Sequence, residues 1–159
     1  MQDSPLGVRL STNLAFNAHE GYANCNWDTA DYVTAFPAGV NVAATWDKRL
    51  AYQRGNAMGN EHRDKGVDVQ LGPVAGPLGR SPNGGRGWEG FSPDPVSTGT
   101  LLAATIKGIQ DAGVIACAKH YILNEQEYFR APGSVEGYEN IPAESSNVDD
   151  KTLHELYLW

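Results

Sequence analysis

The residues best suited to chemistry follow a small apolar segment in the last third of the chain. Residues 114–118 read Val-Ile-Ala-Cys-Ala, and Lys119 and His120 come directly after them. In parallel α/β architectures, binding and catalytic groups gather at the C-terminal ends of such strands. Lys119 would supply a point-charge donor, and His120 a ring whose tautomer its neighbours fix. The alternative is that the pair only begins a solvated loop. The residues by themselves leave both interpretations open.

Two other segments carry charged side chains in a restrained backbone. Asp3 precedes a proline and a glycine that fix the chain direction, although an Asx turn or helix cap is an equally ordinary role. Arg80 and Arg86 lie in the glycine-rich stretch 79–91, where glycine allows positive φ and presents an arginine to a cavity. That stretch lacks the GxxxxGK[ST] pattern of a phosphate loop. Arginine beside carboxylate, amide and aromatic groups instead suits a sugar.

The remaining titratable side chains favour structural roles. Glu125 and Glu127 resemble an acid/base pair by type, but residues two apart diverge on a strand and lie about 200° apart on a helix. We therefore expect structural ion pairs for both. His19, His62 and His154 are isolated histidines, for which a structural role is also expected.

Composition narrows the class of protein. The 159 residues are enough for one domain, and 41% apolar with 19% charged residues is globular rather than disordered. A formal charge of -7 without a basic cluster argues against nucleic acid and anionic membranes as partners. No apolar run approaches the roughly 18 residues of a membrane span.

Cys25 and Cys117 form no disulfide framework, and Cys117 is expected in the core. No motif predicts a metal site or a cofactor.

Hydrophobic periodicity predicts the elements that would carry these residues. Residues 36–45 are interpreted as a strand, 47–65 as a helix, and 67–71 as a second strand. Asp47 would cap the helix and Gly66 end it. One helix face is expected to bury four apolar residues, namely Leu50, Ala51, Ala57 and Met58.

After a long loop over 72–95, the same reasoning gives a helix from about Thr98, with Leu102, Ile106 and Ile109 on one face, to Gly113. A strand over 114–121 follows it. A C-terminal helix capped by Asn147 or Asp149 would place Leu153, Leu156 and Tyr157 on one face. This alternation is typical of βα units around a parallel sheet.

Several segments together resemble one enzyme family. They are residues 1–9, 35–47, 71–73, the loop around Arg86, 119–127 and 146–150. In this order they resemble glycoside hydrolase family 3, and within it the secreted fungal β-glucosidases. The β-N-acetylhexosaminidase branch has a Pro-Gly-His loop after its Lys-His pair, whereas Tyr-Ile-Leu-Asn stands here at 121–124.

The resemblance implies that residues 1–159 are about three or four βα units of a partial (β/α)8-type, TIM-like barrel, the N-terminal catalytic domain of that family. It implies substrate-binding roles for Asp3, Arg86, Lys119 and His120, with Asp3 accepting from glucose hydroxyls and the other three donating. It also implies a secreted enzyme that hydrolyses terminal non-reducing β-D-glucosyl residues of cellobiose, oligosaccharides and aryl β-glucosides with retention.

The resemblance places the family's nucleophilic aspartate and its acid/base glutamate after the position of Trp159, so neither is expected in this chain. Two alternatives stay open: a non-catalytic sugar-binding protein, and a β-xylosidase-like hydrolase of the same family.

The chain departs from the family pattern at two places. Gly87 stands where the family usually has Asn. Residues 11–30 have no clear period and interrupt a family-like sequence that would run from Leu10 directly to Asp31. We interpret them as an insertion. A translated, unspliced intron of 60 nucleotides would account for it, and a true loop insertion is the alternative.

Overall fold

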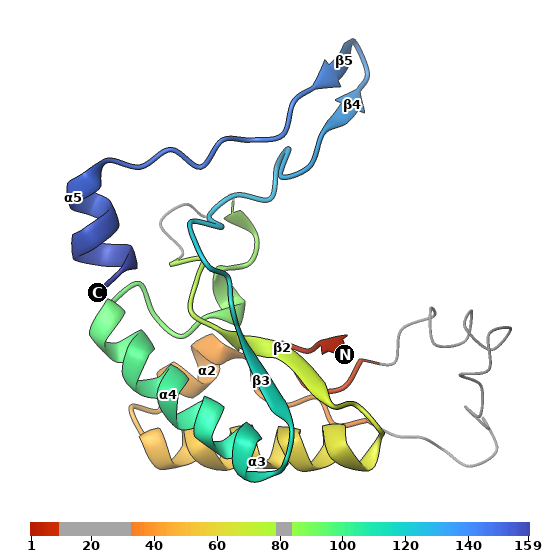
Figure 1. Cartoon of the computed structure of the whole chain (residues 1–159), viewed down its shortest axis with the longest axis vertical. Helices are drawn as coiled ribbons and strands as arrows, with labels where there is room; N and C mark the ends of the chain where they lie inside the picture. Colours follow the sequence, from red (N-terminus) through yellow and green to blue (C-terminus); the bar gives the residue numbers. More distant parts are fainter. Residues whose placement is uncertain (10–32, 79–83) are drawn as a thin grey trace, which may run out of the picture.

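The computed structural model describes residues 1–9, 33–78 and 84–159. A body of alternating strands and helices carries a long arm, formed by the residues that follow β3 (Figure 1). In chain order the elements are β1 (Gln2–Asp3), α2 (Gly39–Ala43), α3 (Lys48–Asp64), β2 (Val69–Val74), the 3-10 turn η3 (Gly87–Glu89), α4 (Pro95–Asp111), β3 (Ile115–Lys119), β4 (Gly133–Val135), β5 (Tyr138–Ile141), α5 (Asp150–Thr152) and the π-helical turn η4 (Leu153–Tyr157). The expected insertion, Arg80, His19 and Cys25 lie outside the described residues.

A parallel sheet in the order β1-β2-β3 forms the centre of the body. Its register pairs Asp3 with Leu71 and Val69 with Ile115. Parallel neighbours need a long crossover, which α3 supplies between β1 and β2, and α4 between β2 and β3. These two helices run side by side along the sheet (Figure 1). The expected α/β class with a parallel sheet is confirmed, and three strands of it are described.

Capping residues determine where both long helices begin and end. Asp47 accepts a hydrogen bond from the backbone N–H of Arg49 at 2.8 Å, and Gly66 follows the end of α3 with φ of +73°. Both expected signals are confirmed. Helix α4 begins earlier than expected, at Pro95, because Asp94 caps it and proline suits the first helical position. Within the described residues, no helix is long and apolar enough to cross a membrane.

The buried face of α3 was predicted only in part. Ala51 and Met58 are buried, but Leu50 is 45% exposed and Ala57 is also exposed. The face packed against α4 instead carries small residues. A Cβ on Gly59 would lie 2.8 Å from the Ala112 Cβ, so only glycine allows the two helices to approach this closely. The close approach of α3 to α4, rather than hydrophobicity alone, therefore determines which face of α3 is buried.

The predicted strand over 36–45 was wrong. This segment contains one helical turn, α2, in which Val42 is 4% exposed and Val40 is 45% exposed. On a strand, residues two apart point to the same side, so both valines would have faced the core. The helical turn lets Val42 alone join the core cluster with Ala51, Phe91 and Leu101.

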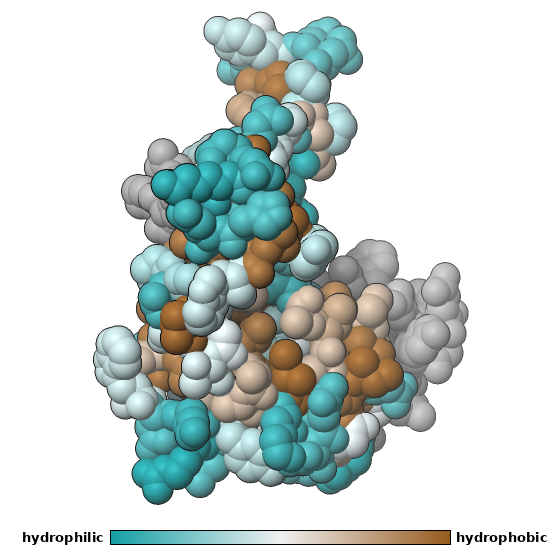
Figure 2. Space-filling view, turned by 60° about the vertical axis from the view of Figure 1, so that its left-hand side comes forward, coloured by the Kyte–Doolittle hydropathy of each residue, from teal (hydrophilic) through white to brown (hydrophobic). Residues whose placement is uncertain are grey.

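Strand β3 is an edge strand, and its predicted burial was wrong. Ile115 is 60% exposed and Cys117 is exposed. Among the described residues, no strand pairs with the edge of β3 that faces away from β2. Cys117 is therefore not a core residue here. Figure 2 shows several hydrophobic patches open to solvent on the body.

The arm contains a hairpin that periodicity did not predict. Strands β4 and β5 pair antiparallel, Val135 opposite Tyr138, around a turn in which Gly137 has φ of +83°. The chain then returns to a short C-terminal helix. Asp149 caps this helix as expected, by accepting from the Thr152 N–H at 2.9 Å, and η4 continues it with π rather than α geometry.

Candidate functional site

Asp3 and Lys119 meet at the C-terminal edge of the sheet. Asp3 ends β1 and Lys119 ends β3, with β2 between them. Neighbouring strands lie about 4.8 Å apart, so the side chains must bridge roughly 10 Å. Lys119 Nζ donates a hydrogen bond to Asp3 Oδ1, so the contact spans the middle strand β2. Two residues predicted from separate segments thus share one site.

Arg86 is held in the same site by a bidentate ion pair. Its Nε donates to Glu89 Oε1 at 2.6 Å, and its Nη2 donates to Glu89 Oε2 at 3.0 Å. Its Nη1 donates to Glu127 Oε1 at 3.2 Å. The hydrogen bond to Glu89 is the main cause that raises the pKa of Arg86 above its ordinary value. Arg86 is a fixed cation with known donor directions.

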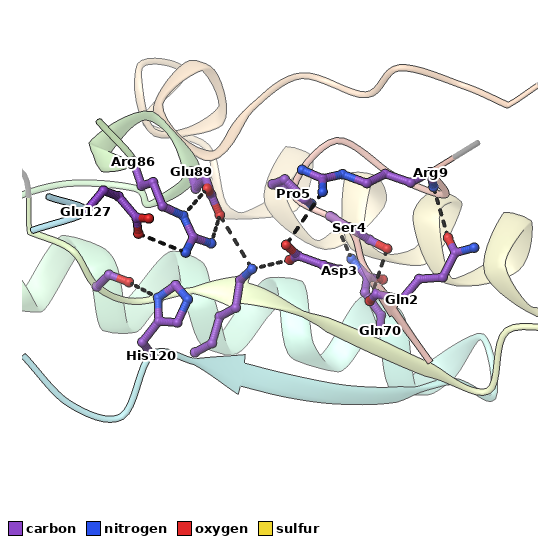
Figure 3. A network of polar contacts seen from close by, with 12 residues as sticks. Gln2, Asp3, Ser4, Pro5, Arg9, Gln70, Arg86, Glu89, His120 and Glu127 are labelled. Atoms are coloured by element: carbon purple, nitrogen blue, oxygen red, sulfur yellow. Dashed lines mark hydrogen bonds and ion pairs between the residues drawn. The ribbon is translucent and has the colours of Figure 1, made fainter. Parts of the chain in front are cut away.

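Glu89 joins the two halves of the site. Its Oε2 lies 3.5 Å from Lys119 Nζ, and its side chain is 5% exposed. The contacts therefore run without a break from Asp3 through Lys119 and Glu89 to Arg86 and Glu127 (Figure 3). We did not predict Glu89 from the sequence. Its spacing of three from Arg86 was a usable signal, because residues i and i+3 lie on one side of a 3-10 turn.

His120 lies beside this network with one ring nitrogen already used. Its Nδ1 is 2.8 Å from the Gly76 carbonyl oxygen, which can only accept, so Nδ1 carries a proton. Burial is the main cause that lowers the pKa of His120, and the charges of Arg86 and Lys119 add to it. A neutral ring in this tautomer presents Nε2 as an acceptor, whereas a protonated ring presents it as a donor.

Asp3 stays an anion in spite of its partial burial. Burial raises its pKa, but the hydrogen bond from Lys119 and the charges of Lys119, Arg9 and Arg86 outweigh that and lower the pKa overall. Arg9 Nη1 lies 3.8 Å from Asp3 Oδ2. Arg9 was not predicted as a site residue. The Asp3 side chain is 39% exposed, so a ligand can reach Oδ2, the oxygen that Lys119 leaves to Arg9.

Arg54 on α3 fixes the chain just beyond Asp3. Its Nη2 donates to the Pro5 carbonyl at 2.8 Å, and its Nε donates to the Pro37 carbonyl at 2.6 Å. Burial lowers the pKa of Arg54 to about 10. A planar guanidinium suits two such acceptors at once.

His62 fixes the residue next to Asp3. Its Nδ1 donates to the Met58 carbonyl at 2.7 Å, so its Nε2 accepts from the Ser4 hydroxyl at 2.9 Å. Ser4 and His62 are both buried, and Gln70 donates to the Ser4 carbonyl at 3.5 Å. The expected structural role of His62 is confirmed.

The other candidates lie around this site or away from it. Glu127 forms ion pairs with Arg86 and Arg130, as expected for a structural acid. Glu125 instead accepts hydrogen bonds from the Leu78 N–H and the Tyr157 hydroxyl through one oxygen. His154 is exposed within η4, where its Nδ1 lies 3.4 Å from Asp150 Oδ1. The described residues contain no group of three His, Cys, Asp or Glu side chains that could hold a metal ion.

This arrangement occurs in a chain whose sequence matches a known family. Residues 1–136 match the description "Glycosyl hydrolase family 3 N terminal domain". The chain belongs to glycoside hydrolase family 3. This family 3 chain is 67% identical to "Probable beta-glucosidase A" of Aspergillus terreus (strain NIH 2624 / FGSC A1156) and 65% identical to "Beta-glucosidase 1" of Aspergillus aculeatus. Each alignment spans 161 residues and covers 100% of this chain and 16% of the relative.

Solved structures of family 3 enzymes have the same fold. The beta-glucosidase of Chaetomium thermophilum superimposes with a TM-score of 0.81 at 57% identity, covering 99% of this chain and 16% of that one. Beta-glucosidase 3B of Thermotoga neapolitana, in complex with alpha-D-glucose, gives 0.67 at 38% identity, covering 79% and 16%. The parallel sheet and its crossover helices thus belong to the family's N-terminal barrel domain. The chain spans about 16% of the length of the curated relatives it matches.

Proposed function

We propose that this family 3 chain forms part of the glucose-binding wall of a retaining β-glucosidase. The whole protein would hydrolyse terminal non-reducing β-D-glucosyl residues of cellobiose, oligosaccharides and aryl β-glucosides. One observation carries the proposal: Asp3, Lys119 and Arg86 come from three distant segments and meet in one polar network at the sheet edge.

The unused hydrogen-bonding capacity of this network fits a sugar diol. Lys119 has three N–H donors. Two of them can serve its carboxylate partners Asp3 and Glu89, which leaves one for a hydroxyl oxygen. Arg86 has five donors, of which three are used by Glu89 and Glu127. Asp3 accepts from Lys119 through Oδ1, and its Oδ2 can accept from a hydroxyl. Neighbouring hydroxyls need this mixture of anionic acceptor and cationic donors.

The similarity to known proteins supports β-glucosides as the substrate class. The relatives that match the whole chain bear the name β-glucosidase, and one solved relative was crystallised with glucose. In the proposal, Asp3, Arg86, Lys119 and His120 bind the ring whose bond is cleaved. Contacts of this kind can strengthen as the ring flattens toward an oxocarbenium ion.

The described carboxylates at this site suit binding better than proton transfer. Asp3, Glu89 and Glu127 are each paired with at least one cation. A general acid must instead hold a proton, which neighbouring cations oppose. In the proposal these carboxylates serve binding, and the nucleophile and the acid/base come from other residues of the whole enzyme, as the family resemblance implies.

Two measurements test the proposal. Purified residues 1–159 should release no glucose from cellobiose or an aryl β-glucoside. The matched segment of the Aspergillus aculeatus enzyme should then be replaced by this chain. That chimaera should hydrolyse both substrates, and Asp3→Ala should lower its kcat/KM by roughly 100-fold or more, because a charged acceptor to hydroxyls is lost.

Asp111→Ala is the matched control, since that aspartate also pairs with a lysine at 2.8 Å but lies on the exposed face of α4. Turnover by repurified residues 1–159 would overturn the assignment of the catalytic carboxylates. A chimaera in which Asp3→Ala is no worse than Asp111→Ala would overturn the glucose-binding wall.

Calorimetry separates a second role. Glucose binding by residues 1–159 that Asp3→Ala abolishes, without activity in the chimaera, would favour a non-catalytic sugar-binding protein. Extracellular action remains a prediction from the resemblance, and immunodetection in culture medium against the cell fraction tests it.

A further inference from the structure

Glu89 is the buried carboxylate between the two cations of the site. Its side chain is 5% exposed, against 39% for Asp3 and 33% for Glu127. A sugar could therefore reach Asp3 more easily than Glu89. Both Glu89 oxygens already accept from Arg86, and one of them also lies 3.5 Å from Lys119 Nζ.

The backbone around Glu89 is fixed independently of its side chain. Its N–H donates to the Arg86 carbonyl at 3.0 Å, and Gly90 forms a bridge with Val74 at the end of β2. Helix α2 begins against this turn, and a Cβ on Gly39 would lie 2.7 Å from the Gly90 carbonyl oxygen. The backbone that carries the Glu89 carboxylate is therefore anchored both to the sheet and to α2.

This geometry dictates how Arg86 is presented. The Nε and Nη2 edge of the guanidinium is occupied by Glu89, which fixes the plane and rotation of the group. Only hydrogens on Nη1 and Nη2 are left to face a ligand. Glu89 Oε2, which accepts from Arg86 Nη2, also lies 3.5 Å from Lys119 Nζ.

We propose that Glu89 is a positioning residue that sets Arg86 and Lys119 jointly for sugar binding. The proposal rests on the proposed function for the identity of the ligand, but not for the positioning itself. Losing the Glu89 charge would free both donors together, although Glu89 touches no sugar. The protein would then bind glucose weakly while its fold is kept.

The test compares Glu89→Gln with Glu127→Gln in 15N-labelled residues 1–159. The Nε–H resonance of Arg86, assigned by its loss in Arg86→Lys, should exchange with water at least roughly 10-fold faster in Glu89→Gln, because it loses its charged acceptor. It should be unchanged in Glu127→Gln, because Glu127 contacts Nη1. Equal exchange in all three proteins, or faster exchange in Glu127→Gln alone, would overturn the positioning role.

Glucose titration of the chimaera supplies the second readout. Glu89→Gln should raise the Kd for glucose at least roughly 10-fold, because the charge-assisted contacts that hold Arg86 are lost. Asp111→Asn loses a charge-assisted contact to Lys107 on the exposed face of α4, away from the site, so it should leave the Kd unchanged. An unchanged Kd in Glu89→Gln overturns the joint positioning. If the unsubstituted chimaera binds no glucose, the proposed function fails, and the Arg86 resonance in residues 1–159 still decides the positioning. Should Glu89→Gln fail to fold, Glu89→Asp replaces it: faster exchange supports the proposal, and wild-type exchange overturns it.

Discussion

Lys119 donates a hydrogen bond to Asp3 across the middle strand of the sheet, although 116 residues separate them along the chain. Asp3 has only the two residues of β1 to anchor it in the sheet. Its position therefore depends on the contacts that Pro5 and Ser4 make with α3.

The Asp3 carboxylate should stabilise the fold only while it is ionised. Its pKa in the folded chain is lower than the ordinary value of 3.8, because its cationic neighbours outweigh burial. The stabilisation is therefore complete above the unfolded pKa, and it is lost as pH falls through the folded pKa. The difference in thermal midpoint between the wild type and Asp3→Asn should be constant from about pH 5 to 7 and shrink below about pH 4. Asp64→Asn, at the exposed end of α3, is the control. A difference that persists at pH 2 would contradict the ion-pair account.

Arg54→Lys should destabilise the chain through the loss of two carbonyl contacts. A lysine cannot donate in a planar fork to Pro5 and Pro37 at once. We expect the free energy of unfolding to fall by about 1.5–3 kcal/mol in urea titrations. Arg63→Lys on the same helix also loses a carbonyl contact, to Ala112 at 3.0 Å, but its side chain is 54% exposed. It should cost less than about 1 kcal/mol. An equal loss of unfolding free energy in Arg54→Lys and Arg63→Lys would show that the burial of Arg54 does not determine the loss.

His62 should make stability depend on pH between 7 and 5. Burial is the main cause that lowers its pKa below the ordinary 6.5. As pH falls below 6.5, the unfolded chain gains a proton that the folded chain does not take up, so stability falls toward the folded pKa. His62→Gln should flatten the slope of thermal midpoint against pH, whereas the exposed His154→Gln should not. The same slope in both variants would exclude His62 as the cause.

Deleting residues 11–30, so that Leu10 joins Asp31, should leave the body of the chain folded. On either side of the segment, Asp3, Arg9 and Thr34 are held by hydrogen bonds with Lys119, Gln2 and Glu61, respectively. Shortening a loop changes closure entropy by only about 1 kcal/mol, so the thermal midpoint should stay within a few degrees. Loss of cooperative unfolding would instead show that this segment is part of the fold. Separately, a mature transcript that retains these codons would exclude a retained intron.

Cys117→Ser should be almost neutral in residues 1–159. The thiol is exposed on the edge strand, so the hydroxyl is not taken out of water. We expect a change within about 0.5 kcal/mol in the free energy of unfolding. A loss of more than about 1 kcal/mol would show that the edge is covered in solution, for instance by a second copy, and sedimentation velocity would detect that copy.

The sequence by itself determined the alternation from α3 through β2 and α4 to β3, and with it the edge at which these strands end. Asp47, Asp149, Gly66 and Gly113 act within one or two turns of the chain, so local chemistry was enough to locate these helix ends, whereas the cap at Asp94 was missed. Because the C-terminal ends of parallel strands share one edge, the alternation also indicated that residues ending different strands would gather there.

Only the tertiary structure decided which side chains are buried and which carboxylate joins the site. The core needed Val42 but not Val40, close helix approach needed glycines on α3, and the position of β3 at the edge exposed Cys117. Glu89 became central because the turn after Arg86 lies over Lys119, a contact between residues 30 apart in the chain. Local sequence preferences do not describe contacts between residues far apart in the chain. The sequence therefore indicated which groups lie at the site, and the three-dimensional packing decided how they are paired.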